Sequence, residues 1–104
     1  MRKMPFELDK KVPREKAFYF FTSIGNYTGE KACSLKEFLE KIEKIELKSI
    51  EFHLRRGDFE KWFRDVLGQK KLAEQISLLR KSDIKGDSLR KELYETILEY
   101  SGTV

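Results

Sequence analysis

The stretch FHLRRGDFEKWF, residues 52–63, decides how the helical part of this chain is built. It holds the only histidine and the only tryptophan of the sequence. Gly57 predicts the end of a helix, because glycine readily adopts the left-handed conformation that closes helices. Asp58 predicts the start of the next helix, since its carboxylate can accept hydrogen bonds from free backbone N–H groups. We therefore expect a helix–turn–helix corner that Phe59 and Trp62 anchor in the core.

Further helices are expected on both sides of this corner. Ser34 followed by Glu37 is a capping box, in which each side chain bonds backbone N–H groups at the start of a helix. Apolar residues follow at helical spacing as far as Ile45. Ser49 can cap a short turn that ends at Gly57. Beyond the corner, the same spacing predicts helices over residues 58–67, 70–81 and 88–100.

A β-hairpin is expected before the first helix. The run AFYFFTSI, residues 17–24, is aromatic and too short for a helix. Gly25 and Asn26 tolerate the backbone conformations of a tight turn, after which residues 27–33 can return as a second strand. The sequence thus predicts an α+β fold, with an N-terminal β-hairpin packed on a bundle of about four α-helices.

Length and composition fit one small domain. The chain has 104 residues, of which 39% are hydrophobic, which is enough for one core and too few for two. Residues 1–13 are basic, hold both prolines and follow no period, so they predict an extended tail before a single α+β domain over 14–104. Charged residues reach 38%, whereas the only side-chain amides are Asn26, Gln69 and Gln75. This balance favours a thermophilic source.

Net charge and cysteine content limit the classes of partner and the cellular compartment that the sequence allows. The net charge of +4 permits RNA or DNA as a partner without requiring either. Cys33 is the only cysteine, so it forms no internal disulfide. No apolar run reaches membrane-spanning length, and residues 1–13 carry charge throughout and have no signal-peptide core. We expect a cytoplasmic protein that does not enter the membrane.

His53 and Asp58 are the only pair that suggests acid–base chemistry. Cys33 is the one thiol that could serve as their nucleophile, but one histidine and one cysteine do not make a metal-ligand set. The segment GNYTGEK, residues 25–31, lacks the spacing of a phosphate-binding loop. We therefore expect no enzyme, no cofactor and no small-molecule substrate, with His53 as a hydrogen-bonding residue at a helix end. A ligand sensor or enzyme built on these three residues is the less favoured alternative.

Aromatic residues of the hairpin suggest where a partner could bind. Tyr19, Phe21 and Tyr27 would share one face, with Lys31 nearby. Proteins hold single-stranded nucleic acid on aromatic platforms beside basic side chains. The other interpretation, which we favour from the sequence, is that helices cover these rings and make them part of the core.

Basic residues also gather in the second half of the chain. A surface that follows a phosphate backbone is one interpretation, and a solvated face with ion pairs is the default one, because acidic residues interrupt the run. The residues concerned are Arg55, Arg56, Lys61, Arg64, Lys70 and Lys71, followed by Arg80, Lys81 and Lys85.

Small size, positive charge and a basic tail favour a non-catalytic accessory binding protein. RNA or a ribonucleoprotein such as the ribosome is the preferred partner. The alternative is a protein–protein adaptor, a regulatory subunit or a homodimer that acts through a helical surface. In that case the contact would use the side of the last helix that carries Tyr94, Leu98 and Tyr100.

Four motifs follow one another along the chain: FYFFTSIGNYTG (18–29), SLKEF (34–38), HLRRGDFEKW (53–62) and VLG (66–68). Together they resemble a family of small, uncharacterised archaeal proteins. The resemblance covers approximately residues 17–80 and implies a portable, non-catalytic module, since the family brings no activity with it. Such proteins often carry an acidic pair after the Leu-Gly step, where this chain has Gln69, Lys70 and Lys71. The resemblance therefore implies a more basic surface here than in its relatives.

Overall fold

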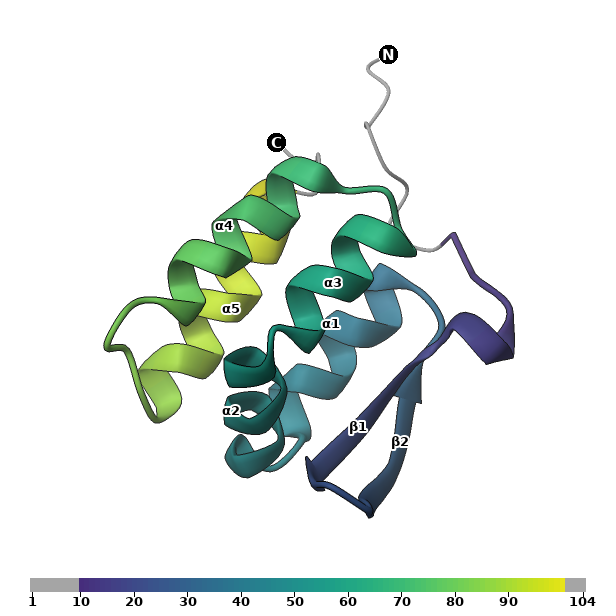
Figure 1. Cartoon of the computed structure of the whole chain (residues 1–104), viewed down its shortest axis with the longest axis horizontal. Helices are drawn as coiled ribbons and strands as arrows, with labels where there is room; N and C mark the ends of the chain where they lie inside the picture. Colours follow the sequence, from purple (N-terminus) through teal and green to yellow (C-terminus); the bar gives the residue numbers. More distant parts are fainter. Residues whose placement is uncertain (1–9, 101–104) are drawn as a thin grey trace.

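The computed structural model describes residues 10–100, so most of the predicted tail lies outside the described residues. A β-hairpin is followed by five α-helices (Figure 1), which confirms the α+β class. The elements are a 3-10 turn η1 (Arg14–Lys16), strands β1 (Phe18–Ser23) and β2 (Asn26–Ala32), and helices α1 (Leu35–Lys44), α2 (Leu47–Arg56), α3 (Asp58–Asp65), α4 (Lys70–Arg80) and α5 (Asp87–Tyr100).

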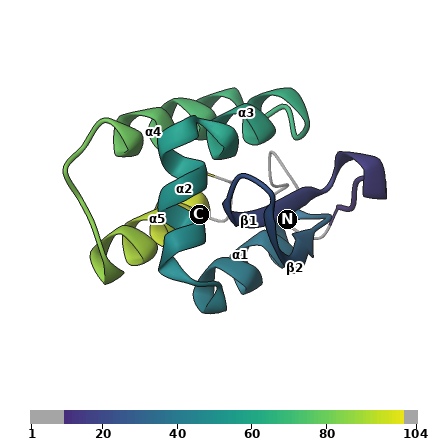
Figure 2. The same cartoon turned by 60° about the horizontal axis from the view of Figure 1, so that its bottom comes forward.

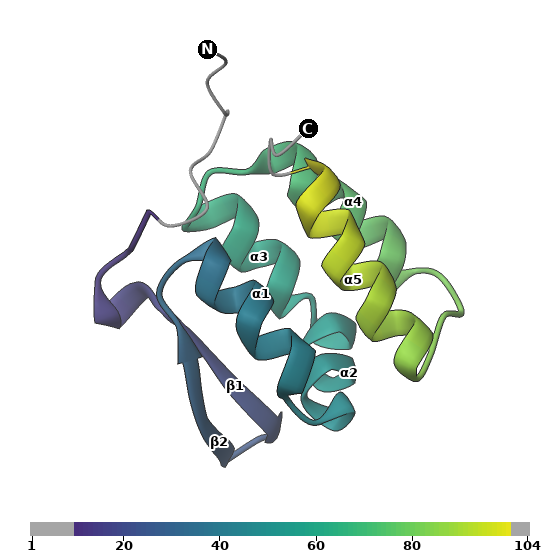
Figure 3. The ribbon, with the colours of Figure 1, turned by 180° about the vertical axis from the view of Figure 1, so that it is seen from behind.

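The helices form two layers with α2 crossing between them. In Figure 2, α3 and α4 lie in one layer, where they pack against each other, and α1 and α5 lie in the other. The hairpin packs on one side of this bundle, with β1 against α2 and β2 against α1. Seen from behind, α1 lies between the hairpin and α5 (Figure 3). The predicted packing of a hairpin on a helical bundle is therefore confirmed.

The capping box at the start of α1 is present. Ser34 Oγ accepts a hydrogen bond from the backbone N–H of Glu37 at 3.1 Å. The Glu37 carboxylate in turn accepts the backbone N–H of Cys33 at 2.8 Å, one residue further back than in the usual box. This bond is the main reason that the pKa of Glu37 is lowered. Lys11 lies 3.2 Å from the same carboxylate, and Val12 N–H bonds the Cys33 carbonyl, so the end of the predicted tail is held against this cap.

The prediction that Ser49 caps a short turn is wrong. Helix α2 begins at Leu47, directly after Glu46, and Ser49 lies within it and is fully buried. Ile50 and Leu54 are also buried, one turn apart, on the face that meets the core. Because this face is buried against the core, the helix begins upstream of Ser49, the residue that local capping preference indicates as its start. The Ser49 hydroxyl has no hydrogen-bond partner among the described residues.

The corner predicted at the centre of the chain is present and is anchored as expected. Gly57 has φ +79°, the left-handed conformation that ends α2. Phe59 is fully buried and Trp62 is 6% exposed. The Trp62 ring stacks on Phe38 with centroids 5.5 Å apart, and its Nε1–H donates to the carbonyl of Lys16 at 2.8 Å. The tryptophan thus ties α3 both to α1 and to the segment that leads into β1.

Replacing Trp62 with alanine should lower the free energy of unfolding by about 3–5 kcal/mol, because it empties a packed site and leaves a carbonyl without its donor. Urea unfolding followed by circular dichroism measures this, since the substitution removes the only tryptophan fluorescence. Leu78→Ala is the control. Leu78 is 59% exposed, so its loss should change stability by less than about 0.5 kcal/mol. Equal stability of the two variants would show that Trp62 does not anchor the corner.

Candidate functional site

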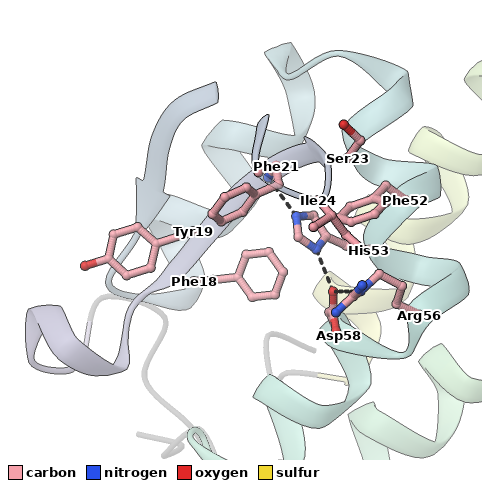
Figure 4. Close-up of a pocket in the computed structure, with 10 residues that line it drawn as sticks. Phe18, Tyr19, Phe21, Ser23, Ile24, Phe52, His53, Arg56 and Asp58 are labelled. Carbon is pink, nitrogen blue, oxygen red and sulfur yellow. Dashed lines mark hydrogen bonds and ion pairs between the residues drawn. The ribbon is translucent and has the colours of Figure 1, made fainter. Parts of the chain in front are cut away.

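His53 joins the hairpin to the helix corner. Its ring is buried, with 4% of the residue exposed, and both nitrogens are hydrogen-bonded (Figure 4). Nε2 lies 2.8 Å from the backbone nitrogen of Phe21, and Nδ1 lies 2.9 Å from Oδ2 of Asp58. A backbone N–H can only donate, so Nε2 accepts and carries no proton. The histidine is therefore the neutral tautomer with its proton on Nδ1, which donates to Asp58.

Asp58 does not have the capping role that the sequence predicts. The residue at the cap position of α3 is Gly57, and no side chain bonds the free N–H groups there. The Asp58 carboxylate instead accepts hydrogen bonds from His53 Nδ1 and from Arg56 Nε, the latter at 3.1 Å. A buried imidazole N–H without an acceptor would destabilise the fold. Supplying that acceptor therefore contributes more to stability than capping the exposed start of a helix. As the first residue of α3, the carboxylate still interacts favourably with the helix dipole.

A hollow of about 330 Å³ opens between the hairpin turn and the α2–α3 corner. The His53 ring lies 6.3 Å from the Phe21 ring and 5.0 Å from the Phe52 ring, measured between centroids. The Arg56 guanidinium lies 5.1 Å above the centre of Phe52, a cation–π contact. Ile24, which is 82% exposed, completes the rim.

Sequence reasoning missed the contributions of Phe52 and Ile24 to this hollow. The spacing of Phe52 and Arg56, four residues apart on one helix, could have indicated their contact, because residues at this spacing are neighbours on a helix surface. Nothing in the local sequence places Ile24 beside them, since that contact depends on how the hairpin turn sits against α2.

The outer face of the hairpin carries an exposed aromatic group. Strand register pairs Tyr19 with Lys31 and Phe21 with Tyr27, so these four side chains lie on the same face of the sheet. Tyr19 is 36% exposed and Tyr27 is 46% exposed. The Tyr27 ring lies 5.8 Å from that of Tyr19 and 5.3 Å from that of Phe21. The interpretation that helices cover these rings is wrong for both tyrosines, because the helices pack on the opposite face, where Phe20 is buried.

The basic residues of the second half do not form one cluster. Arg56 lines the hollow beside His53, whereas the adjacent Arg55 lines a separate one between α2, α4 and α5. Arg64 pairs with Asp65 at 3.1 Å, as the default interpretation of an ion-paired face expects. Lys61 on α3 and Lys70 and Lys71 at the start of α4 are exposed at two further places. Arg80 and Lys85 line the same hollow as Arg55, and Arg80 pairs with Glu60 at 2.9 Å.

Cys33 is not near the imidazole. Register pairs Phe18 with Ala32, so Cys33 lies at the open end of the hairpin, whereas His53 bonds Phe21 further along β1. Cys33 is also absent from the lining of the hollow. The structure therefore brings His53 and Asp58 together without the thiol. Among residues 10–100, no group of three histidine, cysteine or acidic residues is placed to hold a metal ion.

Comparison with known proteins places the chain in a family. Residues 13–103 match the family of unknown function DUF5752. The chain belongs to this family. The match spans the hairpin and all five helices, so the hollow and the exposed tyrosines lie within it. No curated protein and no solved structure matches the chain.

The resemblance noted from the motifs is thus confirmed as far as an uncharacterised family, and its archaeal source stays a prediction. In the described part of the chain, no helix combines the length and apolar character that a membrane span requires.

Stability should fall as the pH drops below about 6.5, because burial lowers the pKa of His53 from its ordinary value of 6.5. Asp58 opposes this shift and Arg56 adds to it. Because the pKa of His53 is higher in the unfolded chain than in the folded protein, the unfolded chain takes up the proton first as the pH falls. The stabilisation is therefore complete above the pKa of the unfolded state and is lost as the pH approaches the pKa of the folded state. Urea midpoints between about pH 7.5 and pH 5.5 measure the decline.

His53→Gln is the matched control for this experiment. Glutamine can accept from Phe21 N–H and donate to Asp58 without titrating, so its stability should stay level over this range. The lowered pKa values of Glu30 and Glu37 place their titration below 4.5, outside the window. An equal decline in wild type and variant would contradict the assignment of the neutral histidine.

Proposed function

We propose that this protein is a non-catalytic binding protein whose partner is single-stranded RNA, alone or within a ribonucleoprotein. The observation that carries the proposal is the exposed tyrosine pair of the hairpin, Tyr19 and Tyr27, beside Lys31. Apolar aromatic surface left uncovered on a small domain often marks a binding site. Here the uncovered rings lie on a strand pair that packs on the core through Phe18 and Phe20.

Several features suit a nucleic-acid strand. A base can stack on an exposed tyrosine ring whatever its identity, and each stacked base contributes about 1–3 kcal/mol. Lys31 lies on the same face, and Arg56 lies at the hollow that Tyr19 and Phe21 also line. These two cations can contact phosphates on either side of the stacked bases, and the net charge of +4 favours approach of a polyanion.

The proposal also includes the source organism and the cellular location of the protein. Composition supports a thermophilic source, the resemblance of the motifs implies an archaeal one, and the single Cys33 supports a cytoplasmic location. The competing function is a protein–protein adaptor that uses the helical surface around Tyr94 and Tyr100. The structure favours the RNA partner over it, because the exposed rings are grouped on the hairpin rather than on α5.

Replacing Tyr27 with alanine should weaken binding of a labelled single-stranded oligouridine by about 5- to 150-fold, which corresponds to the loss of one stacked base. Fluorescence anisotropy at about 50 and 200 mM salt measures the affinity and its salt dependence. Tyr100→Ala is the matched control, because Tyr100 is 37% exposed and lies at the end of α5. Its affinity should equal that of the wild type.

Absence of binding by the wild type at the lower salt concentration would overturn the RNA partner. Equal loss in the Tyr27 and Tyr100 variants would overturn the location on the hairpin. Binding of a protein with no dependence on salt, together with a stable oligomer in size-exclusion chromatography, would support the adaptor instead.

A further inference from the structure

Aromatic rings line the hollow beside His53, which we call the slot. The Phe21 and Phe52 rings lie on either side of the imidazole in Figure 4. Their planes are inclined to the His53 ring by 72° and 68°, so both rings rise steeply from it. We call the buried imidazole the floor of this slot and the two phenylalanines its walls, and the exposed Ile24 also lines it. A volume of about 330 Å³ is within the usual range of small-ligand sites.

Arg56 supplies a cation at the edge of this slot. Its side chain is 50% exposed, so it can reach a ligand without leaving a buried position. Its Nε donates to Asp58 Oδ2, which orients the guanidinium over the Phe52 ring. Among the described residues, no acceptor bonds its two terminal nitrogens, which leaves a fork of donors suited to a phosphate.

We infer that this hollow receives one nucleotide of the bound strand, with its base between Phe21 and Phe52 and its phosphate at Arg56. The inference rests on the proposed function and adds a subsite to it. The hollow shares Tyr19 and Phe21 with the exposed face of the hairpin, so a strand stacked on Tyr27 can continue into it.

The floor of the slot determines how selective this subsite is. Both nitrogens of His53 are already bonded, one to Phe21 N–H and the other to Asp58, so the imidazole offers no donor or acceptor to a base edge. Phe21, Phe52 and Ile24 contribute only apolar side chains. The floor and walls of the slot therefore accept a base by stacking and do not distinguish one base from another by hydrogen bonding. The polar side chains Ser23, Arg56 and Asp58 also line the hollow.

The test compares two neighbouring arginines in the full chain. Arg56→Gln should weaken binding of labelled oligouridine roughly tenfold, because a charged contact to phosphate is lost. The slope of log affinity against log salt should become shallower by about 0.7, the value for one phosphate on a single strand. Arg55→Gln is the matched control, since it removes the same charge one residue away but lines a different hollow. Its affinity should stay within about twofold of the wild type.

Phe52→Leu provides a second test that leaves the charge unchanged. It removes a ring from the slot while retaining an apolar side chain, and it should weaken binding at least about fivefold, equally for oligouridine, oligoadenine and oligocytidine. Thermal midpoints of all variants show whether each remains folded at the temperature of measurement.

The outcomes separate this inference from the function on which it rests. If Tyr27→Ala weakens RNA binding but Arg56→Gln and Phe52→Leu do not, RNA binds the hairpin and the nucleotide subsite is overturned. A strong preference for one base that Phe52→Leu abolishes would contradict recognition by stacking alone. Absence of RNA binding by the wild type would overturn both proposals.

Discussion

The hydrogen bonds of the His53 imidazole connect the two parts of this fold. One nitrogen holds the edge of β1 through Phe21 N–H, and the other holds Asp58, the first residue of α3. The hairpin has only two strands, and such a hairpin is marginally stable by itself in water. Its position depends on the apolar face that it buries against the bundle and on polar contacts across the interface, namely the His53 bond to Phe21 and the ion pair of Glu30 on β2 with Lys41 on α1 at 2.7 Å. Because Nε2 can accept from Phe21 N–H only in the neutral ring, protonation would oppose the packed arrangement.

The same contact shapes the surface. Fixing Phe21 against His53 sets the edge of the hollow, and fixing Asp58 orients Arg56 over Phe52. His53 therefore stabilises the fold and also positions the residues of the candidate site. These two roles explain why His53 and Asp58 resemble a catalytic dyad. The thiol of Cys33 does not complete such a site, because it lies at the other end of the hairpin and does not line the hollow.

The two faces of the hairpin have opposite roles. Phe18 and Phe20 point into the bundle and are nearly or fully buried, whereas Tyr19 and Tyr27 point outward and stay exposed. Alternation along a strand predicts that these residues separate into two sets. It does not predict which set remains uncovered, because that depends on whether helices pack on one face of the sheet or on both.

Sequence by itself determined the elements whose signals lie within a few residues. The hairpin turn, the Ser34 cap and the break at Gly57 depend on local backbone preferences, and the amphipathic helices depend on spacing along one segment. Tertiary structure decided the rest. Asp58 could locally cap a helix or accept from a histidine, and burial of His53 selected the second role. The bond between His53 and Phe21 joins residues 32 positions apart, and the hollow likewise forms between distant segments, which no periodicity along the chain encodes.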